Sequence, residues 1–215
     1  MTVAKKSWLI EFAMAIALLI GVRYMPPLKI PMAVKASLVL WLLFSIYWAI
    51  AARQSKSTES SESLASRQLH VILVNGALLL LVLPIPGLRW RFLFDSKVVI
   101  AIGLIIQLAS IVLAVAARYY LGRNWSGEVR IANEHELMRS GPYRFVRHPI
   151  YCAILGMYIG TMLVSGEIHA PIAFVIVTLA YWRKIGLEDR ALHERFGAEF
   201  AAYCRETSAL IPHVI

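Results

Sequence analysis

The stretch SGPYRFVRHPIYCAILGMYIG, residues 140–160, joins a polar segment to an apolar one, and the rest of the chain is interpreted outward from it. Pro149 suits the first turn of a helix, because its missing N–H group would have no partner there. The residues from Pro149 to Ser165 are apolar or small. We therefore expect an apolar helix that begins directly after His148, at the junction between a polar pocket and a membrane.

Basic residues gather just before this helix start. Arg144, Arg147 and His148 precede Pro149, and the free N–H groups and positive dipole end of a helix favour an anion. We expect a carboxylate or a phosphate to bind there. The alternative is that the two arginines follow the excess of basic residues at the cytoplasmic ends of membrane spans, in which case His148 is only a helix-boundary residue.

Composition indicates an all-α integral membrane protein. Of the 215 residues, 59% are hydrophobic and 16% are charged, which is more apolar side chain than a soluble domain of this size could cover. The net charge of +9 comes from basic residues near span ends, so we expect no nucleic-acid partner. Cys152, Cys204 and the scattered histidines have no paired spacing, so we expect neither a disulfide nor a metal site.

We expect five to six transmembrane helices, followed by a C-terminal amphipathic helix at the cytoplasmic face. Either Asp95 or Ser96 can cap the fourth span, and Gly156 and Gly160 should let a neighbouring helix approach the fifth closely. The third span is short unless it starts a turn earlier, and whether the sixth crosses fully is open. The expected spans are residues 7–24, 32–52, 69–83, 95–121, 149–165 and 170–181, with a serine-rich loop at 55–63 and a tight turn at 166–169.

The last element has a hydrophobic face. Leu192, Phe196, Phe200 and Tyr203 recur at helical spacing, so this helix can lie along the membrane or cover a cavity. Gly197 weakens its middle.

We expect an inner, cytoplasmic-type membrane with the N-terminus on its cytoplasmic side. The positive-inside bias favours this orientation, since 16 of the 22 Lys and Arg residues then lie inside and 6 outside. This topology brings residues 122–148 and the C-terminal helix to one face. Adjacent Glu188 and Asp189 can then meet the basic residues before the fifth span, and a zwitterionic ligand would fit between the two groups. The alternative is that the two acids only begin the amphipathic helix, where they complement its dipole.

The second half of the chain carries an ordered set of motifs. It reads LGRNWSG at 121–127, HEL at 135–137, SGPYR at 140–144, RHPIY at 147–151, then Glu188-Asp189, Phe196-Gly197, Tyr203 and LIP at 210–212. This set resembles the isoprenylcysteine carboxyl methyltransferase family and its phospholipid methyltransferase relatives. Residues 1–94 carry no comparable signature. We therefore expect three N-terminal spans with an acceptor-side role in 1–94, and a methyltransferase core in 95–215.

The resemblance implies S-adenosylmethionine as the methyl donor. Its carboxylate suits the basic helix start, its ammonium suits the two acids, and its sulfonium suits aromatic faces. For catalysis the resemblance points to Glu188, and Arg205 is the candidate for orienting an anionic acceptor; the alternative for Arg205 is a basic residue near lipid headgroups. The residues expected to bind the cofactor are Tyr143, Arg147, His148, Pro149, Tyr151, Glu188 and Asp189.

The family implies a lipid-like or prenyl-like acceptor reached among membrane lipids. A carboxylate on an isoprenylcysteine-like molecule comes first, a phospholipid amine second, and phenols or thiols stay open. The chain departs from the family in two places: Cys204-Arg205-Glu206 stands where prenyl-carboxylate enzymes have a basic run, and Asp189 replaces a glutamate. A membrane reductase with a nicotinamide cofactor and a non-catalytic scaffold are the alternatives from other classes.

Overall fold

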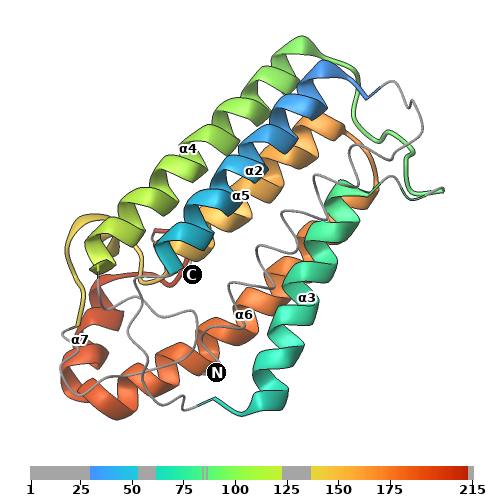
Figure 1. Ribbon diagram of the computed structural model, residues 1–215. Helices are drawn as coiled ribbons and strands as arrows, with labels where there is room; N and C mark the ends of the chain where they lie inside the picture. The colour runs from blue at the N-terminus through green and yellow to red at the C-terminus, as the bar shows by residue number, and fades with distance from the viewer. Residues whose placement is uncertain (1–29, 53–61, 84, 86, 123–136, 213–215) are drawn as a thin grey trace.

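The computed structural model describes residues 30–52, 62–83, 85, 87–122 and 137–212, and in these ranges it is built from helices without strands. Figure 1 shows long helices lying side by side, with a short helix at one end. The elements are α2 (Met32–Ala52), α3 (Leu64–Val82), α4 (Lys97–Leu121), the 3-10 helix η2 (Gly141–Arg144), α5 (Pro149–Ser165), α6 (His169–Phe196) and α7 (Ala198–Glu206).

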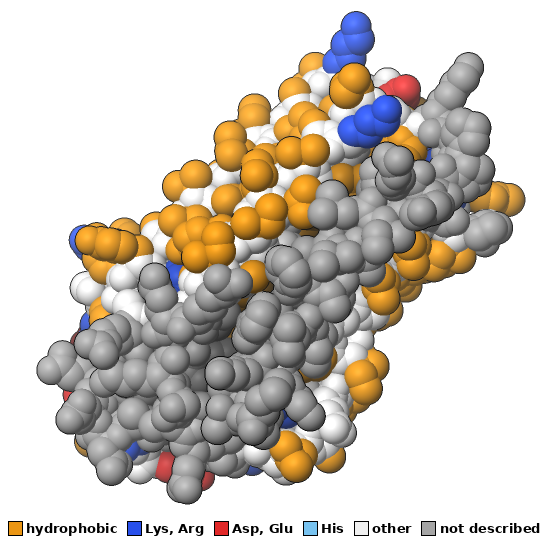
Figure 2. Space-filling model, in the orientation of Figure 1, with side chains coloured by type: hydrophobic (Ala, Val, Ile, Leu, Met, Phe, Trp, Pro, Cys, Tyr) orange, Lys and Arg blue, Asp and Glu red, His pale blue; other side chains and the backbone are white. Residues whose placement is uncertain are grey.

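Length and composition of these helices confirm an integral membrane protein. Four of the described helices, α2, α3, α4 and α6, are long and apolar enough to cross a bilayer, and α5 is a shorter apolar helix of 17 residues. Exposed hydrophobic residues follow α4, among them Ile105, Leu108 and Val112. Figure 2 shows hydrophobic side chains over the part of the surface where α4 runs, as a surface against lipid requires.

The boundaries of α2 and α5 agree with the predicted spans. Helix α4 begins at Lys97, and of the two predicted caps it is Ser96 whose side chain accepts the N–H of Val99. Helix α3 begins at Leu64, earlier than the predicted start at residue 69, and Ser63 caps it. Because the Ser63 side chain accepts the N–H of Ser66, the helix starts among polar residues, before the apolar run. The predicted span at 7–24 and most of the predicted loop at 55–63 lie outside the described residues.

The predicted boundary between the sixth span and the C-terminal helix was wrong. Helix α6 continues to Phe196 as one helix of 28 residues, so no separate helix starts near Glu188. The sequence changes polarity after Tyr181, but a change of polarity does not end a helix. The helix ends at Gly197, whose φ of 50° is easy for glycine and costly for other residues. The predicted hydrophobic face is therefore divided between α6 and α7.

Helices α4 and α5 pack closely through small residues, as predicted from the glycine spacing. A Cβ atom on Gly160 would lie 2.6 Å from the carbonyl oxygen of Gly103, and one on Gly156 would lie 2.3 Å from Ser110 Oγ. The indole Nε1 of Trp41 on α2 donates to Thr161 Oγ1 on α5 at 2.9 Å. Helices α2, α4 and α5 thus form one group, and α3 packs along α6 (Figure 1).

The two ends of the bundle differ. At the far end, the loop before α4 meets the turn between α5 and α6, where Phe92 N–H donates to the carbonyl of Gly166 at 2.8 Å. At the other end, Arg118 of α4 donates to the carbonyl of Ala51 of α2 at 3.0 Å. The second end, which we call the site end, also holds η2, the start of α5 and α7 (Figure 1). The residues before α5 and the last helix therefore lie at one end, as predicted.

Candidate functional site

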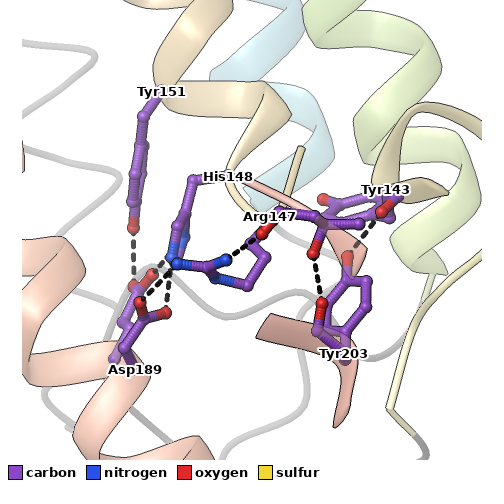
Figure 3. Close-up of polar contacts among 8 residues, drawn as sticks. Tyr143, Arg147, His148, Tyr151, Asp189 and Tyr203 are labelled. Atoms are coloured by element: carbon purple, nitrogen blue, oxygen red, sulfur yellow. Dashed lines mark hydrogen bonds and ion pairs between the residues drawn. The ribbon is translucent and has the colours of Figure 1, made fainter. Parts of the chain in front are cut away.

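Five side chains meet where α5 begins, and we call them the polar cluster: Arg147, His148, Tyr151, Glu188 and Asp189. Figure 3 shows Arg147, His148, Tyr151 and Asp189. His148 Nε2 lies 2.8 Å from Asp189 Oδ1, and His148 Nδ1 lies 3.4 Å from Glu188 Oε2. Arg147 Nη2 lies 3.4 Å from Asp189 Oδ2. The hydroxyl of Tyr151 donates to Glu188 Oε1 at 2.6 Å. The predicted meeting of basic and acidic groups is therefore confirmed.

The two acids lie inside α6 and not at a helix start. The alternative in which Glu188 and Asp189 only complement an N-terminal dipole is therefore wrong. Because the cluster joins residues about forty positions apart, it links the start of α5 to the second half of α6. One rigid helix, α6, carries both acids at a fixed distance from the basic residues.

The C-terminal segment holds the basic residues in place. The backbone N–H groups of Arg147 and His148 donate to the carbonyls of Ser208 and Ala209, at 2.9 and 3.0 Å. The guanidinium of Arg147 also donates to the carbonyl of Thr207. The N–H groups of the two residues just before the helix are therefore already bonded. The side chains of Arg147 and His148 remain the groups that could recognise an anion at this site.

The acidic neighbours of His148 favour its charged form. Burial lowers the pKa of its imidazole, but the hydrogen bonds and negative charges of Asp189 and Glu188 outweigh burial and raise the pKa to about 9. Its side chain is only 6% exposed, so the charge is shielded from water. Lys184, also buried on α6, adds a third positive group near Glu188. Arg147, His148 and Lys184 thus face two acids.

One donor in the polar cluster lacks a partner. Arg147 Nε is buried and has no hydrogen-bond partner. A buried N–H group without a partner is costly and seldom persists unless a ligand or water completes it. The side chain of Arg147 therefore offers a donor to an anion.

Aromatic rings continue from the polar cluster toward α3. The His148 ring stacks on Tyr151, with centroids 5.4 Å apart. Tyr151 contacts Tyr181 of α6 at 4.6 Å, and Tyr181 meets His70 of α3 at 5.3 Å. Sequence reasoning missed Tyr181 and His70. The position of Tyr181 two helical turns before Glu188 could have indicated it, whereas His70 gave no signal beyond being polar in an apolar span.

The other predicted residues lie around the polar cluster. Tyr143 in η2 is buried, which raises the pKa of its phenol, and its carbonyl accepts a hydrogen bond from the Tyr203 hydroxyl (Figure 3). Pro149 is buried at the first position of α5, as predicted. Arg205 is exposed on α7, and among the described residues we find no contact between it and the polar cluster. The LGRNWSG and HEL motifs lie mostly outside the described residues.

Comparisons with known proteins show similarity to methyltransferases. The model of the isoprenylcysteine carboxyl methyltransferase family matches residues 101–194. Protein-S-isoprenylcysteine O-methyltransferase A of Arabidopsis thaliana is 29% identical over 60% of this chain, and the match spans 64% of that relative. The probable protein-S-isoprenylcysteine O-methyltransferase of Oryza sativa subsp. indica is 26% identical over 79% of this chain and 90% of its own. Methanethiol S-methyltransferase 1 of Bradyrhizobium diazoefficiens is 27% identical, and the match spans 84% of this chain and 67% of that relative.

Proposed function

We propose that the chain, which matches the model of the isoprenylcysteine carboxyl methyltransferase family over residues 101–194, transfers a methyl group from S-adenosylmethionine to an amphiphilic acceptor. The observation that carries the proposal is the polar cluster at the start of α5. It sets two acids against buried cations, leaves a donor of Arg147 open and stands beside stacked rings.

The residues fit the methyl donor by charge and shape. Arg147, with its unpartnered Nε, would hold the donor's carboxylate. Glu188 and Asp189 would take its ammonium group by sharing the bonds they now make to His148. The faces of Tyr151 and Tyr181 would stabilise a sulfonium cation. When bound, the donor supplies an electrophilic methyl group.

The protein's part in catalysis would be positioning in a dry site. Methyl transfer is a direct displacement, and holding two reactants in line contributes several kcal/mol, about 7 to 11 in well-oriented cases. Glu188 is half-buried and hydrogen-bonded to Tyr151, so it keeps a fixed geometry beside the rings. Arg205 is assigned to the acceptor at the rim, because it is exposed on the helix that packs at the site end.

The bilayer would deliver the acceptor. We assign residues 1–94 to the acceptor side and residues 95–215 to the methyltransferase core. The basic residue count supports an N-terminus and a site on the cytoplasmic side. The first acceptor to test is the carboxylate of an isoprenylcysteine-like molecule, since several relatives are named for that reaction.

A second class of acceptor carries a proton on its nucleophile. Glu206, next to Arg205 and exposed, places a negative charge where a carboxylate acceptor would want a cation. A phospholipid amine or a thiol would avoid this repulsion, and one relative is named a methanethiol S-methyltransferase.

The test is transfer of an isotope-labelled methyl group from S-adenosylmethionine by the detergent-purified protein. Three acceptors would be offered: an S-farnesylated cysteine, phosphatidylethanolamine and 1-dodecanethiol. We expect label in one extracted product, with transfer lost in Glu188→Ala and retained in Glu167→Ala, a control at the far end. Preferential binding of a nicotinamide dinucleotide would favour the reductase instead. Ligand binding that survives in Glu188→Ala, without transfer in any protein, would favour the scaffold.

A further inference from the structure

The loop before α4 alternates between side chains that bind the protein and side chains that are exposed, over residues 89–94. On the bound side, Arg89 lies 3.4 Å from Glu167, and Arg91 donates to the carbonyl of Ser165 at 2.9 Å. The side chains between them are aromatic and 74%, 46% and 94% exposed, and we call them the loop aromatics: Trp90, Phe92 and Phe94. Such alternation is typical of an extended chain, in which neighbouring side chains point to opposite sides. The loop therefore has one side held by the α5–α6 turn and one exposed apolar side.

The same loop satisfies backbone groups of the α5–α6 turn. The N–H of Ile168 donates to the carbonyl of Trp90 at 2.9 Å, and the N–H of His169 donates to the carbonyl of Leu88 at 3.2 Å. Backbone groups in hydrocarbon need partners within the protein, because lipid chains offer none. With these N–H groups bonded to the loop, the turn can lie below the lipid headgroups.

Helix α5 is short for a membrane span, and this places the turn after it at such a depth. It has 17 residues, so at about 1.5 Å of rise per residue it spans about 25 Å, against a hydrocarbon core of about 30 Å. Tilting the helix would shorten its reach further. When the start of α5 lies at one edge of the hydrocarbon, the turn stops about 5 Å short of the other edge. The loop that covers the turn then lies at that edge.

The loop aromatics also adjoin the lipid-facing side of α4. From Phe94, exposed apolar residues recur three or four positions apart along the chain: Val98, Ile102 and Ile105. This spacing places the residues of α4 on one face of the helix. Between Phe94 and Val98, Asp95 and Lys97 are charged and exposed, and charged groups are costly among acyl chains. The loop therefore lies where the headgroups meet the acyl chains, and its neighbour on the exposed side is lipid.

We propose that Trp90, Phe92 and Phe94 insert into the bilayer at the far end, between the phospholipid headgroups and the first carbons of the acyl chains. Aromatic rings with a polar edge, such as that of tryptophan, favour this layer of a membrane. The partner is the phospholipid bilayer, and the inference goes beyond the proposed function without depending on it. Because the loop is bonded to the α5–α6 turn, its insertion fixes the height of α5 in the bilayer. It thereby also fixes the height of the polar cluster at the other end of α5.

The experiment measures the depth of Trp90 by quenching its fluorescence in phosphatidylcholine vesicles. The chain has six tryptophans, so the contribution of Trp90 is the difference between the intact protein and Trp90→Phe. Acyl chains brominated at carbons 6 and 7 quench near the headgroups, those brominated at carbons 11 and 12 quench deeper, and iodide on both sides of the vesicle quenches from water. Phe94→Trp adds a second reporter at the most exposed ring. Trp41→Phe is the matched control, because Trp41 is buried.

We expect the shallow bromines to quench the Trp90 contribution at least about twofold more strongly than the deep bromines or iodide, as for a ring at the headgroup level. The tryptophan added in Phe94→Trp should show the same order of quenching, and the Trp41 contribution should be insensitive to all three quenchers. Strongest quenching of Trp90 by iodide would place the loop in water and overturn the proposal. Strongest quenching by the deep bromines, or equal quenching by both lipids, would overturn the interfacial depth and with it the proposal.

Discussion

The two ends of the α5–α6 hairpin carry the same three types of side chain in different arrangements. At the site end, His148 pairs with Asp189 at 2.8 Å, and Arg147 pairs with the same acid at 3.4 Å. At the far end, His169 Nε2 lies 3.1 Å from Glu167 Oε2, and Arg89 Nη2 lies 3.4 Å from Glu167 Oε1. Residue type alone therefore does not distinguish the two ends.

The arrangement of partners distinguishes them. Glu167 and His169 lie two residues apart in a tight turn, and the loop residue Arg89 is 35% exposed, so this group fastens a loop to a turn. The site end joins residues far apart in sequence, adds stacked rings, and includes a buried Arg147 nitrogen with no partner. Both ends hold a buried nitrogen without a partner, Arg147 Nε at the site end and His169 Nδ1 at the far end. Among the described residues, the site end sets its open nitrogen beside stacked rings, which suits it to a ligand.

The largest expected difference is in stability after loss of one acid. Glu188→Gln leaves the buried His148 with Asp189 as its remaining acidic partner and should cost about 3 kcal/mol. Glu167→Gln should cost about 1 kcal/mol or less, because its partner Arg89 is 35% exposed. Thermal unfolding in detergent without ligand measures both. Equal shifts would show that the two ends are electrostatically alike.

The close packing of α4 against α5, which lies between the two ends, can be tested at Gly160. An alanine Cβ there would meet backbone atoms of Gly103 and Gln107 within 3 Å, so Gly160→Ala should destabilise the bundle by about 1 to 3 kcal/mol. Gly76 on α3 has open space around its added Cβ. Gly76→Ala should therefore be neutral or stabilising by up to about 1 kcal/mol. Unfolding curves in detergent that show Gly160→Ala as the more stable variant would contradict the close packing of α4 and α5.

Raising the pH should weaken the site end through His148. Its pKa is raised from 6.5 to about 9 in the folded protein, so the stabilisation is complete below about pH 6.5 and is lost as pH rises through about 9. His148→Gln should flatten this dependence between pH 7 and pH 9.5. Melting temperatures measured across that range give the answer. The same slope in the variant would assign the dependence to another group.

A smaller effect is expected where α7 docks. The Tyr203 hydroxyl donates to the carbonyl of Tyr143, and burial raises the pKa of this phenol to about 12. Tyr203→Phe should cost about 1 kcal/mol of stability and leave affinity for S-adenosylhomocysteine within about twofold. Thermal unfolding and calorimetry would measure these two quantities. A large loss of affinity would show that Tyr203 contributes to the site itself.

Sequence reasoning predicted the start of α5 and its close packing, because each had a cause in neighbouring residues. Pro149 fixed the start of α5, and the glycine spacing anticipated its contact with α4. The pairing of Arg147 and His148 with the two acids followed from charge and topology. The length of α6 could not be deduced, since polarity changed where the helix did not. The contribution of His70 depends on how α3 packs along α6, which no pattern within α3 records.

The central claim is that the site end, and not the far end, binds S-adenosylmethionine. The direct measurement is calorimetric titration of the purified protein with S-adenosylhomocysteine, alongside His148→Ala and His169→Ala variants shown to be folded. We predict saturable binding to the intact protein, a loss of about 30-fold or more in His148→Ala, as expected when one partner of a buried charge pair is removed, and a change within about threefold in His169→Ala. No binding to the intact protein, or equal losses in both variants, would contradict the account.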